Sequence, residues 1–95
     1  MYYMKLNFTY MNFFLYIIYS QKTDHYYIGS TKNLQDRLQR HQQGRSKATK
    51  SGAPDWTVVY TETFETNSLA RQRESYLKRM KSRKFIEQLI TNQSD

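Results

Sequence analysis

The 95-residue sequence contains no cysteine, one proline and three glycines, and its longest apolar run is too short to cross a bilayer. The lack of cysteine excludes disulfides and thiolate metal sites and favours a reducing compartment, so we expect a cytoplasmic protein. The scarcity of proline, together with 16% aromatic residues, argues against a disordered chain. A chain of this length is expected to form one domain with one modest core.

Acidic residues are also scarce in this chain. Eight Asp and Glu face fifteen Lys and Arg, which gives a formal net charge of +7 and a pI of about 9.7. A small, basic, tyrosine-rich domain predicts a polyanionic partner, most often nucleic acid, with solubilising charge as the alternative. The basic residues gather mainly in two runs, residues 37–50 and 71–84. We expect phosphate-backbone contacts from seven basic residues, Lys32, Arg40, Arg45, Lys47, Lys50, Arg73 and Lys78.

The first ten residues are largely aromatic and apolar, and they precede a second methionine, Met11. They lack the basic start and the small-residue cleavage site of a signal peptide. We expect residues 1–10 to be a dispensable extension and residues 11–91 to form the domain. Residues 92–95 are expected to be a frayed tail.

Three segments predict a small antiparallel sheet. Phe13–Tyr19 is a β-branched and aromatic run, which is typical of a central strand. A polar turn at residues 21–24 joins it to a second short strand, His25–Ile28, which Gly29 ends, so the two form a hairpin. Trp56–Glu62 alternates strictly and predicts a third strand, with Trp56, Val58 and Tyr60 on one face and Thr57, Val59 and Thr61 on the other.

Three helices are predicted around this sheet. Asn33 caps the first helix, Gly44 stops it, and residues 44–55 follow as a loop. The second helix begins at a polar cap, which is Thr66, Asn67 or Ser68. After a break near Ser82, the third helix presents apolar residues at core spacing, namely Phe85, Ile86, Leu89 and Ile90. The order ββαβαα predicts an α+β domain whose helices flank a small, mostly antiparallel sheet.

Glu74 lies on the predicted inward stripe of the second helix, together with Ala70, Leu77 and Met80. An inward carboxylate needs a compensating charge, because an isolated buried charge is too costly. Either a local ion pair, for instance with Lys78 at i,i+4, or a bound cation supplies that charge.

Arg37 and His41 share one face of the first helix. They are either a solvated arginine and a half-buried histidine, or a phosphate clamp beside a group that moves protons near neutral pH. Tyr16 and Tyr27 lie on the hairpin strands, where tyrosines are usually packing residues. Tyr27 shares its face with Gly29, which lets a backbone or a ligand approach closely.

Taken in order, these residues resemble the GIY-YIG nuclease superfamily. The resemblance is closest to its small single-domain bacterial members and more distant to the UvrC-type excision-repair nuclease domain. The two name tripeptides correspond to residues 14–16, Phe-Leu-Tyr, and to residues 27–29, Tyr-Ile-Gly, of which the second matches completely. An arginine and a histidine follow at Arg37 and His41, and residues 70–90 resemble the A…RE..LK…LI pattern of the single-domain branch.

The resemblance implies a three-stranded antiparallel sheet flanked by helices, and metal-dependent hydrolysis of phosphodiester bonds. It implies that Tyr16 and Tyr27 line the site and that one of them helps to activate the attacking water. Arg37 would hold the scissile phosphate, and His41 would orient or accept a proton. Glu74 would bind one divalent cation, Mg²⁺ or Mn²⁺.

We therefore expect an endonuclease that cleaves DNA, single-stranded or branched DNA included, with little sequence specificity of its own and a role such as DNA repair. RNA stays open as a substrate, and a nucleic-acid-binding module without catalysis is the alternative. A tyrosine base would need nearby positive charge to lower its pKa, which Lys32, Arg37 and the metal would supply.

The chain departs from the family pattern at Phe14, where the first tripeptide has glycine, and at Ser30, where UvrC-type domains have lysine. It also has no clear equivalent of the asparagine that follows the metal-binding glutamate in some family nucleases.

Overall fold

A three-stranded antiparallel sheet forms the centre of the molecule, which we describe from a computed structural model covering residues 12–93. The strands are β1 (Phe13–Ser20), β2 (His25–Thr31) and β3 (Trp56–Phe64), in the order β2-β1-β3. β1 is the central strand and pairs antiparallel with both neighbours. The expected extension, residues 1–10, lies outside the described residues.

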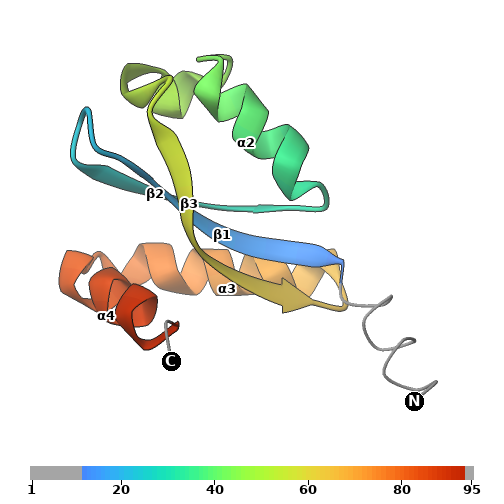
Figure 1. Cartoon of the computed structure of the whole chain (residues 1–95). Helices are drawn as coiled ribbons and strands as arrows, with labels where there is room; N and C mark the ends of the chain where they lie inside the picture. Colours follow the sequence, from blue (N-terminus) through green and yellow to red (C-terminus); the bar gives the residue numbers. More distant parts are fainter. Residues whose placement is uncertain (1–11, 94–95) are drawn as a thin grey trace.

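The helices cover both faces of this sheet (Figure 1). α2 (Leu34–Gln42) lies over one face, and α3 (Asn67–Met80) and α4 (Arg83–Gln93) lie over the other. The predicted α+β class and the order of strands and helices are confirmed, with one addition. The segment expected to be a plain loop contains a 3₁₀ helix, η1 (Lys47–Gly52). No helix within residues 12–93 is long and apolar enough to span a membrane.

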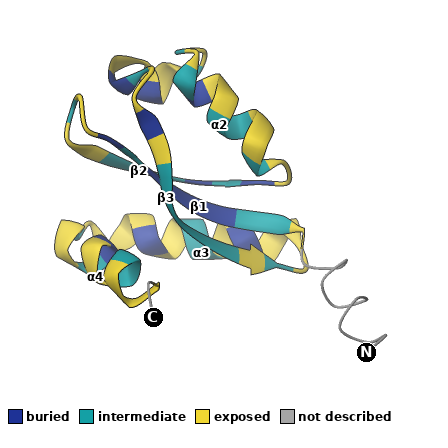
Figure 2. Cartoon of the chain, in the orientation of Figure 1, coloured by how far each residue is buried: buried dark blue, intermediate teal, exposed yellow. Residues whose placement is uncertain are grey.

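Alternate residues of β1 build two separate apolar clusters, one on each face of the sheet. Leu15 and Ile17 are fully buried on the side of α3 and α4, where Leu77 and Ile86 join them. Tyr16, Ile18 and Trp56 form the second cluster, on the side of α2. Burial therefore follows β1 along most of its length (Figure 2), as its continuous apolar sequence predicts.

Local polar contacts fix the helix ends where the sequence predicts them. The Asn33 side chain accepts the backbone N–H of Asp36 at the start of α2, and Gly44 follows α2 with φ +71°. Of the three candidate caps for α3, Thr66 has this role, and its hydroxyl accepts the N–H of Leu69 at 3.1 Å.

The predicted alternation along β3 is wrong beyond its first half. Ile17 pairs with Tyr60 but Ile18 pairs with Val58, so Val59 is an extra residue in a β-bulge. Val59 and Tyr60 both pack against the cluster on the α3 side, whereas Val58 packs with the cluster on the α2 side. The bulge changes the face on which Tyr60 lies, which a strictly alternating sequence does not reveal.

Three predicted boundaries also differ from the structure. β2 does not end at Gly29 but continues to Thr31, because β1 keeps pairing with it as far as Phe14. Met80 does not belong to the inward stripe of α3, since it is 41% exposed. α4 extends through Gln93, so the helix runs beyond the start of the expected tail.

Candidate active site

Tyr16 is, together with His41, the most deeply buried of the candidate site residues. It lies on the α2 side of β1, is 1% exposed, and forms a 2.8 Å hydrogen bond between its Oη and Nε2 of His41. Gly29 lies directly opposite on β2. A Cβ at that position would lie 2.5 Å from Tyr16 Oη, so only glycine leaves room for the phenol ring.

His41 is held from its other nitrogen by Thr49. His41 is buried near the end of α2, and its Nδ1 lies 2.6 Å from Thr49 Oγ1. Thr49 is itself buried in η1, and its carbonyl accepts the indole N–H of Trp56 at 2.9 Å. Thr49 could not be recognised from the sequence, because a threonine in a polar stretch without periodicity carries no signal of its role.

Burial controls the charge states of this pair. Burial is the largest of the effects that together raise the pKa of Tyr16 to about 12; Tyr27 and Glu74 act in the same direction, and Arg37 opposes them. The expected lowering by positive charge is thus present, but it is smaller than the effect of burial. Burial also lowers the pKa of His41, with Arg37 and Arg40 acting in the same direction. At neutral pH both side chains are therefore uncharged.

Arginines gather beside the tyrosine–histidine pair. A pocket next to α2 is lined by Arg37 and Arg40 together with the other residues Tyr27, Asp36, His41 and Ser46. The Tyr27 and His41 rings lie 5.1 Å apart, centroid to centroid. The fold thus brings together the four residues predicted to be catalytic, Tyr16, Tyr27, Arg37 and His41.

Glu74 lies on α3, on the face of the sheet opposite to α2, and its carboxylate contacts the edge strand β2. Ser30 of β2 donates its hydroxyl to Oε1 of Glu74 at 2.6 Å, and Lys78 donates to Oε2 at 2.6 Å. The Lys78 ammonium also lies 5.7 Å from the centre of the Tyr27 ring. The ion pair that the sequence allowed is therefore present, and Glu74 is close enough to Tyr16 to affect its pKa.

The environment of Glu74 fits a single hard cation. Its side chain is 21% exposed, and each carboxylate oxygen accepts one hydrogen bond and keeps another lone pair. Within residues 12–93 there is no group of three or more His, Cys, Asp or Glu that could hold a metal. Magnesium does not need one, because it binds through one or two carboxylates, with water and substrate oxygens completing its shell.

The seven predicted phosphate-binding residues differ in their surroundings. Arg73 donates to both carboxylate oxygens of Glu62, at 2.9 and 3.0 Å, and Lys78 is paired with Glu74. These acids compete with a phosphate for the two cations. Arg40 lines the arginine pocket, while the remaining four are exposed, namely Lys32, Arg45, Lys47 and Lys50.

The sequence profile described as the GIY-YIG catalytic domain matches residues 12–87. The chain belongs to the GIY-YIG family. It is similar to the UPF0213 protein CPE1444 of Clostridium perfringens (strain 13 / Type A), with 33% identity over 73 residues and 77% of each chain covered. It is also similar to the solution NMR structure of the UPF0213 protein BH0048 from Bacillus halodurans. That comparison gives a TM-score of 0.53 and 27% identity, and it covers 85% of this chain and 84% of the other. The resemblance read from the sequence is confirmed, and the GIY-YIG chain has a nuclease-type fold.

The burial of His41 has a consequence for stability that can be measured. The pKa of His41 is lowered from its ordinary value of 6.5. As the pH falls, His41 is therefore protonated at a higher pH in the unfolded chain than in the folded GIY-YIG domain. Stability from this group is complete above pH 6.5 and falls as the pH drops below that value. We expect urea unfolding of the wild type to show this loss below pH 6.5, and His41→Gln to show a flatter dependence.

The matched control for this prediction is His25→Gln, because His25 is exposed at the start of β2. It should keep the pH dependence of the wild type. Equal slopes for the wild type and His41→Gln would contradict the buried, neutral state of His41.

Proposed function

We propose that this GIY-YIG protein is a metal-dependent endonuclease that hydrolyses DNA phosphodiester bonds with little sequence specificity of its own. The observation that supports it most is the buried hydrogen bond from Tyr16 to His41, a residue that also lines the arginine pocket. Nucleic-acid binding alone requires neither this pair nor an acid such as Glu74 beside it. A cytoplasmic location, and a role such as DNA repair, are part of this proposal.

Tyr16 and His41 supply a path for the proton of the attacking water. Because the pKa of Tyr16 is raised to about 12, a free phenolate is scarce at neutral pH. Tyr16 instead takes the proton from water as its own hydroxyl proton passes to Nε2 of His41, 2.8 Å away. Arg37 offers the forked pair of donors that suits the phosphate being cleaved.

Thr49 positions His41 for this transfer. The Thr49 hydroxyl lies 3.5 Å from the Ser46 carbonyl, which can only accept a hydrogen bond. With the hydroxyl donating there, Thr49 Oγ1 accepts from Nδ1–H of His41. We assign this tautomer because it leaves Nε2 free to accept the proton of Tyr16.

Glu74 would hold one Mg²⁺ or Mn²⁺ ion at the edge of β2. When bound, such an ion stabilises negative charge on the phosphate or on the leaving oxygen. Ser30 fixes the orientation of the Glu74 carboxylate through its 2.6 Å hydrogen bond. Lys78 supplies positive charge to the other carboxylate oxygen and lies beside Tyr27.

Supercoiled plasmid DNA tests the proposed activity directly. The purified protein is incubated with plasmid in Mg²⁺, in Mn²⁺ and in EDTA, and the nicked form is measured on gels. We expect nicking with either metal and none in EDTA. Plasmid, single-stranded and branched DNA that all stay intact in both metals would overturn the proposal.

One observation favours a second function, a nucleic-acid-binding module without catalysis. Both carboxylate oxygens of Glu74 already have hydrogen-bond donors within the chain. Such a module would shift plasmid on a gel at low salt and would show no turnover that depends on metal.

A further inference from the structure

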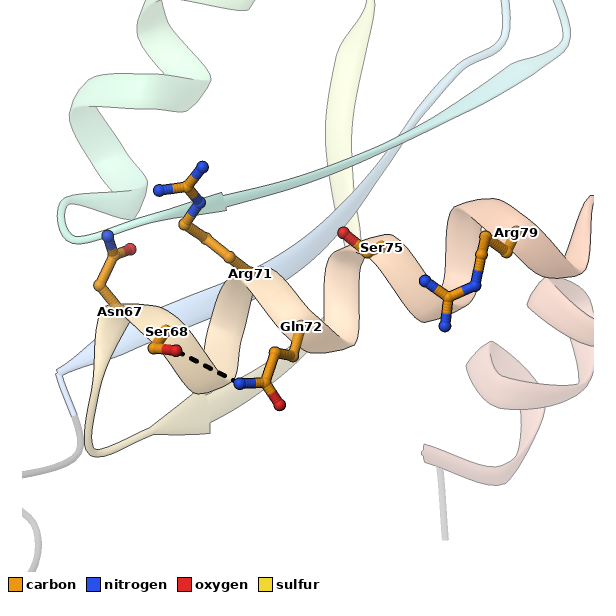
Figure 3. A pocket seen from close by; sticks show the side chains of 6 residues that line it. All are labelled: Asn67, Ser68, Arg71, Gln72, Ser75 and Arg79. Atoms are coloured by element: carbon orange, nitrogen blue, oxygen red, sulfur yellow. Dashed lines mark hydrogen bonds between the residues drawn. The ribbon is translucent and has the colours of Figure 1, made fainter.

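The exposed face of α3 forms a shallow polar groove that the proposed reaction does not use (Figure 3). Six residues line it, and none is acidic: Asn67, Ser68, Arg71, Gln72, Ser75 and Arg79. Two guanidinium groups, two amides and two hydroxyls thus face one surface. All of them can donate hydrogen bonds.

The positive charge of this groove is not neutralised within the described part of the chain. The neighbouring cations have acidic partners: Arg73 pairs with Glu62, and Lys78 pairs with Glu74. Arg71 and Arg79 have no ion pair or hydrogen bond among residues 12–93. The groove therefore keeps two arginines available for a negatively charged partner.

Glu74 lies beside the groove, level with its middle along α3. Arg71 precedes Glu74 by three residues, so their side chains are neighbours on the helix. Figure 3 shows Arg71 near one end of the groove and Arg79 at the other. Eight residues of helix separate the two arginines by about 12 Å. Glu74 lies three residues after Arg71 and five residues before Arg79, so a nucleic-acid strand that follows the groove would pass Arg71, the level of Glu74 and then Arg79.

We propose that this groove binds the phosphodiester backbone of the nucleic acid on either side of the cleaved position. Arginine forks, amides and hydroxyls are the groups that contact phosphates without reading sequence. At a rise of about 3.4 Å per nucleotide in one strand, 12 Å corresponds to about three or four nucleotides. The inference rests on the proposed function for the position of the substrate, and it adds a binding surface outside the active site.

Salt-dependent binding tests the groove separately from cleavage. Anisotropy of a fluorescently labelled DNA duplex is measured in EDTA over a range of salt concentrations, so that no metal-dependent cutting occurs. We expect Arg71→Gln and Arg79→Gln each to weaken binding and to reduce the slope of log K against log salt by about one. Lys84→Gln on α4 is the matched control, because it removes the same charge from another surface.

Slopes for Arg71→Gln and Arg79→Gln equal to that of Lys84→Gln would overturn the groove as a backbone site. That result would leave metal-dependent nicking by the wild type untouched. Conversely, a wild type that never cuts would overturn the proposed function, while a lower slope in both arginine variants would still support the groove. In an active enzyme, Arg79→Gln should raise KM, because it removes a contact that holds the substrate backbone.

Discussion

Glu74→Gln is expected to reduce metal-dependent cleavage of plasmid by about 10²–10³-fold, which is the usual loss when one charge-stabilising group is removed from an active site. The amide keeps the shape of the side chain and an oxygen that accepts the Ser30 hydroxyl. It loses the negative charge that would hold a divalent cation. Nicking rates over a range of Mn²⁺ concentrations measure the effect, and circular dichroism checks the fold.

Glu87→Gln is the control for this variant. Glu87 is an exposed acid on α4 that pairs with Arg83, also at i,i+4. The control therefore removes the same charge and the same type of ion pair, and it should cut at the wild-type rate. Glu74→Gln cutting as fast as Glu87→Gln would rule out Glu74 as the metal ligand.

Tyr16→Phe should lower the cleavage rate by about 10²–10⁴-fold, the range expected when a proton-transfer group is lost. The variant also leaves Nε2 of the buried His41 without its partner, which costs about 1–3 kcal/mol of stability. The two effects separate when rates are measured well below the melting temperature of each protein. A pH–rate profile then shows whether the remaining activity still depends on the Tyr16–His41 pair.

Tyr19→Phe on the same strand is the matched variant. Its hydroxyl also donates a hydrogen bond, to Asp24 at 2.7 Å, but this bond is exposed at the hairpin turn. We expect Tyr19→Phe to cut normally. A Tyr16→Phe protein that is folded and fully active would show that water is activated by another group.

Much of the fold follows from local sequence features. The apolar run of β1, the caps at Asn33 and Thr66 and the apolar spacing in α4 each depend on residues close together in the chain, so a single sequence carries them. The bulge at Val59 could not be predicted, because it arises when two residues of β3 face one pairing position on β1. A sequence records the alternation of one strand and not its register against another.

In the candidate site, too, contacts between residues close in the sequence could be predicted, whereas contacts that depend on the tertiary fold could not. Glu74 and Lys78 are four residues apart on one helix, so their ion pair could be anticipated. Thr49 could not, since its contact with His41 depends on how η1 folds back onto α2. The high pKa of Tyr16 was also hidden, because burial depends on the whole sheet and its covering helix rather than on nearby charges alone.

The length of the turn between β1 and β2 determines which residues of the two strands lie opposite each other, and so it controls the geometry of the site. Tyr16 faces Gly29 and Ile18 faces Tyr27 only in the present register, which the turn after Ser20 sets. A single residue inserted into that turn, with β1 kept in place, would shift β2 by one position and send its side chains to opposite faces. Tyr27 would leave His41, and a side chain would enter the space that Gly29 leaves for the Tyr16 ring. Over evolutionary time, this turn should therefore accept changes of residue type far more readily than insertions or deletions.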